Sequence, residues 1–268
     1  MPGFGITLGY TLLYLGLLVL LPLGALVTKA SSIGVTGLIA TASEPRVAAA
    51  LWTSFSLSLI AAAVASLFGL LVAWVLTRYD FPGRKIVDAI VDLPFALPTA
   101  VAGIALAALY APNGWVGELL APLGLKVAYT PLGIFVALVF IGLPFAVRTV
   151  QPMIVEIERE LEEASATLGA SRWRTVWSVL LPPLLPGILT GFALAFARAV
   201  GEYGSVIFIA GNLPYVSEIA PLLIVIKLSE YDYTGATVIA TIMLAISFAA
   251  LLAINLIQAW SRRRFGHV

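Results

Sequence analysis

Long apolar runs dominate the pattern of hydrophobic and polar positions along this chain. Each run has about 20 or more mostly apolar residues, the length that an α-helix needs to cross the hydrocarbon core of a bilayer. The runs are uniformly apolar and do not alternate as the strands of a membrane barrel do, so the pattern predicts helices. Six such stretches are expected to span a membrane: residues 6–27, 52–76, 86–111, 131–150, 185–210 and 233–259.

The first apolar stretch also raises the alternative of a cleaved signal peptide. No Lys or Arg precedes it, and no clear small-x-small cleavage site follows it. We therefore expect a retained first helix with an outer linker over residues 1–46, a core over 47–260 and a tail over 261–268. The fold class is an all-α, polytopic membrane protein.

Composition narrows the class of protein further. The chain has 268 residues, of which 61% are hydrophobic and 11% are charged, and its net charge is +1. A soluble domain is about 25% charged, so this chain lacks the residues for a polar surface. The near-neutral balance gives no basic excess for nucleic acid. Cysteine is absent and His267 is the single histidine, which leaves no ligands for a thiolate or histidine metal site.

The distribution of Lys and Arg predicts the orientation. One set of alternate span ends holds ten: Arg78, Arg84, Lys85, Arg148, Arg159, Arg172, Arg174, Arg262, Arg263 and Arg264. The opposite set holds four: Lys29, Arg46, Lys126 and Lys227. Positive charge gathers in cytoplasmic loops, so both termini are expected inside. The outer links are then residues 28–51, 112–130 and 211–232, and residues 217–228 are apolar enough to dip into the membrane.

The cytoplasmic segment 148–182 differs from the rest of the chain. Residues 153–168 form a strongly helical, acidic stretch, and Gly169 is expected to end it in the left-handed conformation. Ser171 can cap a second, basic-aromatic helix that we expect Pro182 and Pro183 to end. A solvated connector and a docking surface for a soluble partner remain as alternative interpretations.

The same segment carries a resemblance to a known family. Glu163, Ala164 and Ser165, then Gly169, then the run from Val179 to Pro182 resemble the EAA motif E-A-A-x3-G-x9-I-x-L-P. That motif marks permease subunits of binding-protein-dependent ABC importers. Ser165 and Val179 depart from it conservatively, and the spacing holds throughout. Charge, glycine and proline at fixed offsets make the match specific.

Further segments are similar to sulfate/thiosulfate permeases, and closest to their T-type subunit. The similarity covers about residues 50–260 and includes these stretches: DLPFALPTAVAG at 92–103, YAPNGW at 110–115, RAVGEYGS at 198–205, AGNLP at 210–214 and SEIAPLL at 217–223. Molybdate permeases share the EAA loop but differ in two of these stretches.

The resemblance implies a type I ABC importer permease fold and a coupling helix that docks on an ATP-binding subunit. Glu163 and Gly169 would carry the docking, with Ala164, Ser165, Leu168 and Pro182 near them. The chain contains no G-x4-G-K-[ST] phosphate loop, so we expect no cofactor here and ATP with Mg on the partner. The implied partners are two ATP-binding subunits, a second permease chain, identical or W-type, and an extracytoplasmic sulfate-binding protein. The implied location is a bacterial or archaeal inner membrane.

Arg198 and Glu202 lie inside the fifth predicted span, four residues apart and so on one helix face. Ionisable residues within a membrane are costly and suggest function. One interpretation is a self-neutralising pair that stabilises the bundle. The other is an anion pathway at Arg198, with Glu202 limiting the affinity and Tyr203 and Ser205 adding neutral donors. Asp88 and Asp92 are interpreted as anchors at the start of the third span, where Pro94 and Pro98 are expected to kink the helix.

The predicted function is therefore the permease subunit of a sulfate/thiosulfate ABC importer, which is not itself an enzyme. A permease for molybdate, tungstate or another oxyanion is the alternative within the class. An ion-coupled secondary carrier or channel is the alternative outside it. The sequence does not distinguish a homodimer from a heterodimer of permeases.

Overall fold

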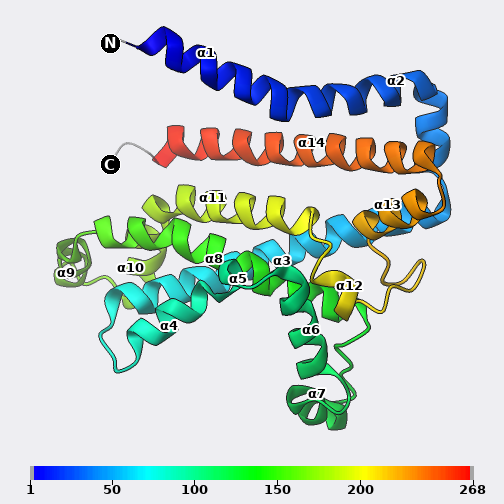
Figure 1. Ribbon diagram of the computed structural model, residues 1–268. Coiled ribbons are helices and arrows are strands. Elements are labelled where there is room, and N and C mark those ends of the chain that lie inside the picture. Colours follow the sequence, from blue (N-terminus) through cyan, green and yellow to red (C-terminus); the bar gives the residue numbers. More distant parts are fainter. Residues whose placement is uncertain (1–2, 266–268) are drawn as a thin grey trace.

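The computed structural model describes residues 3–265, with side chains as far as Trp260. The predicted tail at 261–268, with Arg262, Arg263, Arg264 and His267, lies outside the side chains described. All regular elements of the described part are helical (Figure 1). The helices are α1 Phe4–Leu15, α2 Leu21–Ala42, α3 Pro45–Arg78, α4 Arg84–Val91, α5 Leu93–Ala96, α6 Thr99–Tyr110, α7 Trp115–Leu120, α8 Pro131–Glu156, α9 Arg159–Thr167, α10 Arg172–Thr175, α11 Leu181–Val200, α12 Val206–Ile209, α13 Ala220–Ser229 and α14 Tyr233–Phe265, with π turns at Gly16–Leu20 and Val176–Leu180 and a 3-10 turn at Ala121–Leu123.

Six helical segments are long and apolar enough to cross a membrane, as the hydrophobic pattern predicts. Figure 1 shows α3, α8, α11 and α14 running along one common direction. The α9 and α10 segment lies at one end of this bundle, and α13 lies at the other. The six candidate spans are Phe4–Ala42, Pro45–Arg78, Thr99–Leu123, Pro131–Glu156, Arg172–Val200 and Tyr233–Trp260.

Small residues bring α3, α8 and α11 close together. A Cβ added at Gly69 of α3 would lie 2.6 Å from the Cβ of Ala146, and one at Gly191 of α11 would lie 3.1 Å from the Cα of Ala146. In lipid, helices associate through such close packing because there is little hydrophobic drive between them. Gly187 and Gly204 also lie at close contacts, whereas a Cβ added at Gly201 would meet no atom within 4 Å.

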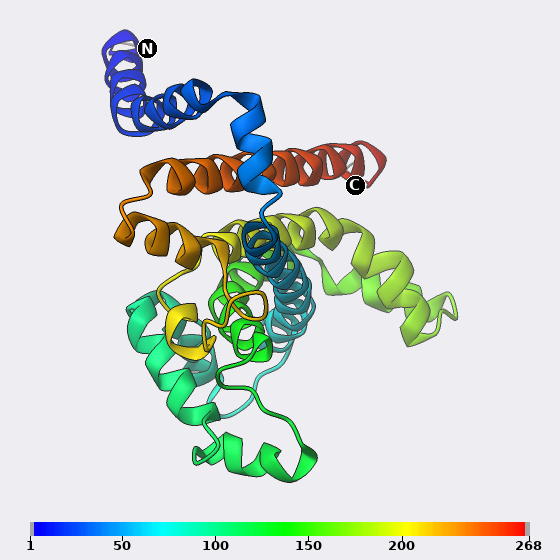
Figure 2. The ribbon, with the colours of Figure 1, turned by 90° about the vertical axis from the view of Figure 1, so that its right-hand side faces the viewer.

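The N-terminal arm extends further than its prediction. The first candidate span, Phe4–Ala42, has 39 residues and none of its most apolar window is buried. Its helix bends at Gly34, whose φ of 78° and ψ of 159° are non-helical. The predicted outer link 28–51 is therefore wrong, because helix continues to Ala42 and α3 begins at Pro45, where proline suits the first turn of a helix. Figures 1 and 2 show this arm on the outside of the bundle, beside α14.

The third predicted span, 86–111, is not one helix. It divides into α4, α5 and α6, with Leu97 and Pro98 extended between the last two. Pro98 disfavours helical geometry at Leu97 and has no N–H to continue the hydrogen-bond ladder. The helix is therefore interrupted at Leu97 and Pro98, where only a kink was expected. As a result, α6 and α7 run away from the direction of α3 and α8 (Figure 1).

Candidate functional site

The cytoplasmic segment is built from two short helices and a glycine turn. Gly169 adopts a φ of +80°, as predicted, and Ser171 caps α10 by accepting a hydrogen bond from the N–H of Arg174 at 3.3 Å. The predicted single helix over 153–168 is wrong. Ile157 and Glu158 are extended, so α8 ends at Glu156 and α9 begins at Arg159.

The second helix of this segment does not end at Pro182 and Pro183. It continues through the π turn Val176–Leu180 into α11, as a single apolar segment from Arg172 to Val200. A π turn widens the helix, which relieves the clash of a proline ring with the preceding carbonyls. The predicted fifth span 185–210 is thus displaced, because the helix starts earlier and ends at Val200.

Three of the six predicted coupling residues line one hollow. Ala164, Ser165 and Leu168 line it, and Leu168 is 88% exposed. The Ser165 and Thr175 hydroxyls are hydrogen-bonded at 2.8 Å, which holds α9 against α10. Glu163 is exposed on α9 and Gly169 follows it, whereas Pro182 lies beyond the π turn, on α11, and does not line the hollow. The hollow measures about 430 Å³ and is lined by Leu161, Ala164, Ser165, Leu168, Ala170, Arg174 and Val179.

Arg78, at the end of α3, connects the second span to the cytoplasmic segment 148–182, called the coupling segment below. Its Nη2 donates to the carbonyl of Ile157 at 2.9 Å and lies 3.1 Å from Glu162 Oε1. Its guanidinium also lies 5.3 Å from the centre of the Trp74 ring. Sequence reasoning placed Arg78 only in the charge count. The four-residue spacing of Trp74 and Arg78, which places both on one helix face, was the sequence signal for their contact.

Arg198 and Glu202 do form an ion pair, although not along one helix as predicted. Arg198 lies in the last turn of α11, and Glu202 follows the end of that helix at Gly201. Arg198 Nη1 donates to Glu202 Oε2 at 2.5 Å. Glu202 Oε1 accepts from the N–H of Ser205 at 2.9 Å and from its hydroxyl at 3.0 Å. The carboxylate therefore also fixes the turn into α12.

Exposure divides this pair into a buried partner and an open one. The Glu202 side chain is 2% exposed and that of Arg198 is 34% exposed. Beyond Nη1, the guanidinium makes no hydrogen bond to any residue that the structure describes. Ser205 is fully buried and its hydroxyl is taken by Glu202, while Tyr203 packs against the apolar core. The site thus presents one cation with free donors beside a carboxylate that is held out of solvent.

A second charged cluster joins α4 and α5 to α8. Arg148 donates to Asp88 Oδ1 at 2.6 Å, to both carboxylate oxygens of Asp92 at 2.8 and 2.6 Å, and to Gln151. Asp88 and Asp92 were interpreted as anchors near Arg84 and Lys85. In the structure they hold Arg148, which sequence reasoning assigned to the loop, while Arg84 pairs with Asp80 at 2.7 Å.

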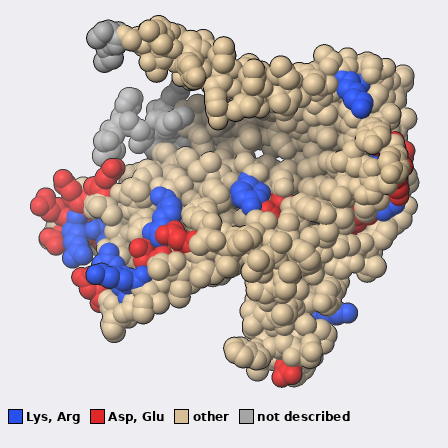
Figure 3. All heavy atoms as spheres, in the orientation of Figure 1, with Lys and Arg blue, Asp and Glu red and all other residues tan. Residues whose placement is uncertain are grey.

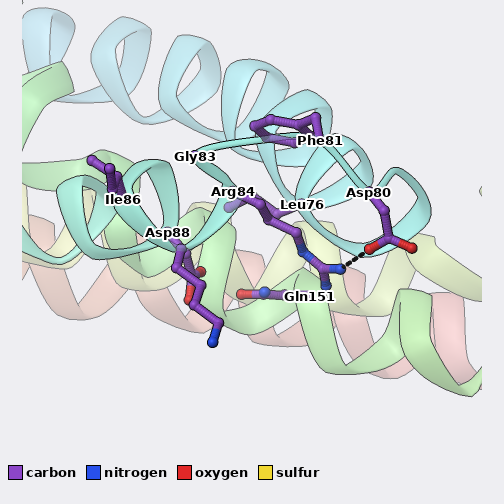
Figure 4. Close-up of a pocket in the computed structure, with 9 residues that line it drawn as sticks. Leu76, Asp80, Phe81, Gly83, Arg84, Ile86, Asp88 and Gln151 are labelled. Atoms are coloured by element: carbon purple, nitrogen blue, oxygen red, sulfur yellow. Dashed lines mark hydrogen bonds and ion pairs between the residues drawn. The ribbon is translucent and has the colours of Figure 1, made fainter.

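Beside this cluster an open groove of about 770 Å³ runs along α4, lined by Arg84, Lys85, Asp88 and Gln151 among others. Figure 4 shows Arg84 turned toward Asp80, with Gln151 of α8 close to the end of the Arg84 side chain. Its lining holds two cations, Arg84 and Lys85, and two carboxylates, Asp80 and Asp88, so it has no excess of either sign for an anion or a cation. Figure 3 shows that charges gather at this end of the molecule, while the long helices show few.

At the opposite end, Arg46 and Glu218 form a pair that sequence reasoning missed. Arg46 Nε and Nη2 donate to the two oxygens of Glu218 at 2.8 and 2.7 Å. Ser54 Oγ accepts from the N–H of Ala220, which fixes the start of α13 on α3. No group of three or more His, Cys, Asp or Glu residues within the described chain is placed to hold a metal.

Comparisons with known proteins agree with this architecture. Residues 65–267 match the family described as "Binding-protein-dependent transport system inner membrane component". The "Sulfate transport system permease protein CysT" of Synechococcus elongatus is 51% identical over 257 residues, covering 96% of this chain and 92% of the relative. The protein of the same name from Escherichia coli is 47% identical and covers 100% and 97%.

Solved structures share the fold at lower identity. A permease chain in a bacterial alginate ABC transporter has a TM-score of 0.74 at 18% identity, covering 98% of this chain and 94% of that one. A chain of the MetNI methionine ABC transporter has a TM-score of 0.60 at 20% identity, covering 82% and 99%. Sequence, spans and fold therefore agree that this chain is a multi-pass membrane permease of the binding-protein-dependent ABC transporter family, within its CysT group.

Proposed function

We propose that this chain is the permease subunit of an ATP-driven sulfate importer in the inner membrane of a bacterial cell. Relatives that are about half identical over nearly the whole chain carry the name of sulfate transport permeases. One structural observation carries the proposal, namely a cation with free donors in the last turn of the α11 span, next to a buried carboxylate.

Arg198 would attract the dianion, and Glu202 would limit how tightly it is held. An unpaired guanidinium would bind an oxyanion strongly through charge-assisted hydrogen bonds. A conduit needs binding that is favourable enough for entry and weak enough for release. The carboxylate on one side of Arg198 supplies that moderation, while the exposed side of the guanidinium faces the anion.

An uptake measurement on the Arg198→Ala, Glu202→Ala double variant tests this role. Removing both charges avoids leaving one of them buried and unpaired. We expect the double variant to assemble normally and to take up labelled sulfate at least tenfold more slowly. The Asp80→Ala, Arg84→Ala pair is the matched control, because it is also spaced by four residues but is exposed. Normal assembly with wild-type uptake would refute the pathway role.

The coupling role belongs to the hollow beside α9. We infer that Glu163, Ala164, Ser165, Leu168 and Gly169 contact an ATP-binding subunit, with Pro182 supporting the segment from α11. ATP and Mg would be bound by that subunit. The rigid Ser165–Thr175 contact and the Arg78 link would let its motion reach α3 and α11 together. A second permease chain and an extracytoplasmic sulfate-binding protein would complete the importer.

Two measurements separate this proposal from its rivals. Competition among labelled sulfate, thiosulfate and molybdate in uptake assays identifies the preferred oxyanion, and we expect sulfate to compete best. Vanadate, which blocks ABC ATPases, is expected to abolish uptake. Vanadate-insensitive uptake driven by an ion gradient alone would instead indicate a secondary carrier or channel.

A further inference from the structure

An apolar groove lies between α3 and the continuous helix formed by α10, the π turn and α11. Its volume is about 260 Å³. All of its lining side chains are aliphatic or aromatic, so the groove suits a hydrocarbon chain. The lining comprises Leu70, Leu71, Trp74, Trp173, Val176, Leu180, Leu181 and Leu184.

The groove lies at the boundary between membrane and cytoplasm. Leu70 and Trp74 belong to the last turns of the span Pro45–Arg78, and Trp173 to the first turn of the span Arg172–Val200. These ends of the two spans are next to the basic segment that is predicted to be cytoplasmic. Trp173 and Trp177 are 72% and 56% exposed and pack edge to face, with ring centres 6.0 Å apart. Exposed tryptophans at a span end are typical of the lipid headgroup layer.

One arginine ends each wall of this groove. Arg78 follows Trp74 by four residues, and Glu162 already meets its charge. Arg172 precedes Val176 by four residues and so lies on the same side of its helix. Arg172 is exposed and forms no ion pair with any described residue. A free cation above an apolar slot is complementary to a lipid that has an anionic headgroup and an acyl chain.

We propose that this groove binds an anionic phospholipid of the cytoplasmic leaflet. Its acyl chain would lie along Trp74 and Leu180, and its phosphate would meet Arg172. An ATP-binding subunit is the other conceivable occupant. The lining favours lipid, because from Trp173 to Leu184 the groove extends about 16 Å into the span at 1.5 Å per residue, beyond the reach of a soluble domain.

Tryptophan quenching in the assembled transporter tests the proposal. The complex is reconstituted in nanodiscs that contain brominated phosphatidylglycerol or brominated phosphatidylcholine at equal mole fractions. We expect the anionic lipid to quench at a several-fold lower fraction. The Trp173→Phe variant should lose much of this difference, whereas Trp115→Phe, on the exposed α7, should keep it.

Arginine variants locate the headgroup contact. Arg172→Ala should lower the preference for phosphatidylglycerol by about fivefold, the effect of one basic residue near an anionic surface. Arg172→Lys should largely keep it. Arg174→Ala is the matched control, because Arg174 lies two residues on and lines the hollow beside α9 instead.

Three results would overturn the proposal. Equal quenching of the wild type by the two lipids would remove headgroup selection, and this comparison requires no variant to fold. Equal losses in Arg172→Ala and Arg174→Ala would indicate diffuse surface charge. Emission that neither lipid quenches, with Trp173→Phe and wild type alike, would mean that a protein subunit covers the groove.

Discussion

Specific partners hold the buried ionisable residues of this chain, and Glu218, which lies just before α13, is the clearest case. Its side chain is 1% exposed and accepts both hydrogen bonds of Arg46. Arg46→Ala leaves that carboxylate buried and uncompensated, which costs about 3 kcal/mol of unfolding free energy, the low end for a buried pair because Arg46 is partly exposed. Thermal unfolding in detergent measures the loss. Arg84→Ala, from an exposed pair, should cost less than about 1 kcal/mol; an equal loss would contradict the argument.

Asp232 caps α14, and its ionisation makes the stability of the connection between α13 and α14 depend on pH. Its Oδ1 accepts from the N–H of Gly235 at 2.8 Å, and Lys227 lies 3.1 Å from its Oδ2. The backbone hydrogen bond first, and Lys227 second, lower the pKa of the Asp232 carboxyl. Its stabilisation is therefore present above the unfolded pKa of about 3.9 and is lost as the pH falls through the folded value.

The Asp232→Asn variant isolates this contribution, because asparagine keeps a cap but cannot ionise. We expect wild type to have the higher melting temperature above about pH 5, with the difference shrinking below about pH 4. A melting-temperature difference that stays constant between about pH 3 and about pH 7 would show that ionisation of Asp232 does not contribute.

At the scale of elements, the hydrophobic pattern predicts where apolar helices occur better than where they end. Proline had opposite consequences in two places. At Pro98 the helix is interrupted, whereas at Pro182 a π turn lets the helix continue. Which outcome occurs depends on packing against α8, α3 and α12, and no local pattern contains that information. Gly169 and Ser171 were predictable because their turn and cap depend on neighbouring residues alone.

Close packing of α3 on α8 makes Gly69 a sensitive position. A Cβ there would meet the Cβ of Ala146 at 2.6 Å and the backbone N of Val147 at 3.2 Å. Gly69→Ala should therefore cost about 1–3 kcal/mol of unfolding free energy through overpacking, although alanine favours helix. Gly24→Ala in α2 is the control, since no atom lies within 4 Å of its Cβ. Unfolding in detergent should show the control unchanged or stabilised; a stabilised Gly69→Ala would contradict the packing argument.

Across the whole molecule, charges link segments that are far apart in the sequence. Arg148 joins α8 to Asp88 and Asp92, and Arg46 joins α3 to Glu218, 172 residues away. The sequence indicated the Arg198–Glu202 pair because its partners are four residues apart. It did not indicate the long-range pairs, because partner choice there follows from tertiary packing. The candidate site was therefore predictable at its centre and not in its connections.

Arg78 connects α3 to the coupling segment, and its replacement tests whether that connection transmits motion. Arg78→Lys keeps the charge but loses the planar group that contacts Ile157, Glu162 and the Trp74 ring together. We expect sulfate uptake by the reconstituted transporter to fall about five- to tenfold, a loss of about 1–1.4 kcal/mol, while ATP hydrolysis stays near wild type. Arg84→Lys, at the exposed end of the same loop, should leave both rates unchanged. Parallel loss of uptake and hydrolysis in Arg78→Lys would point to failed assembly, and unchanged uptake would show that α9 transmits motion to the spans without this arginine.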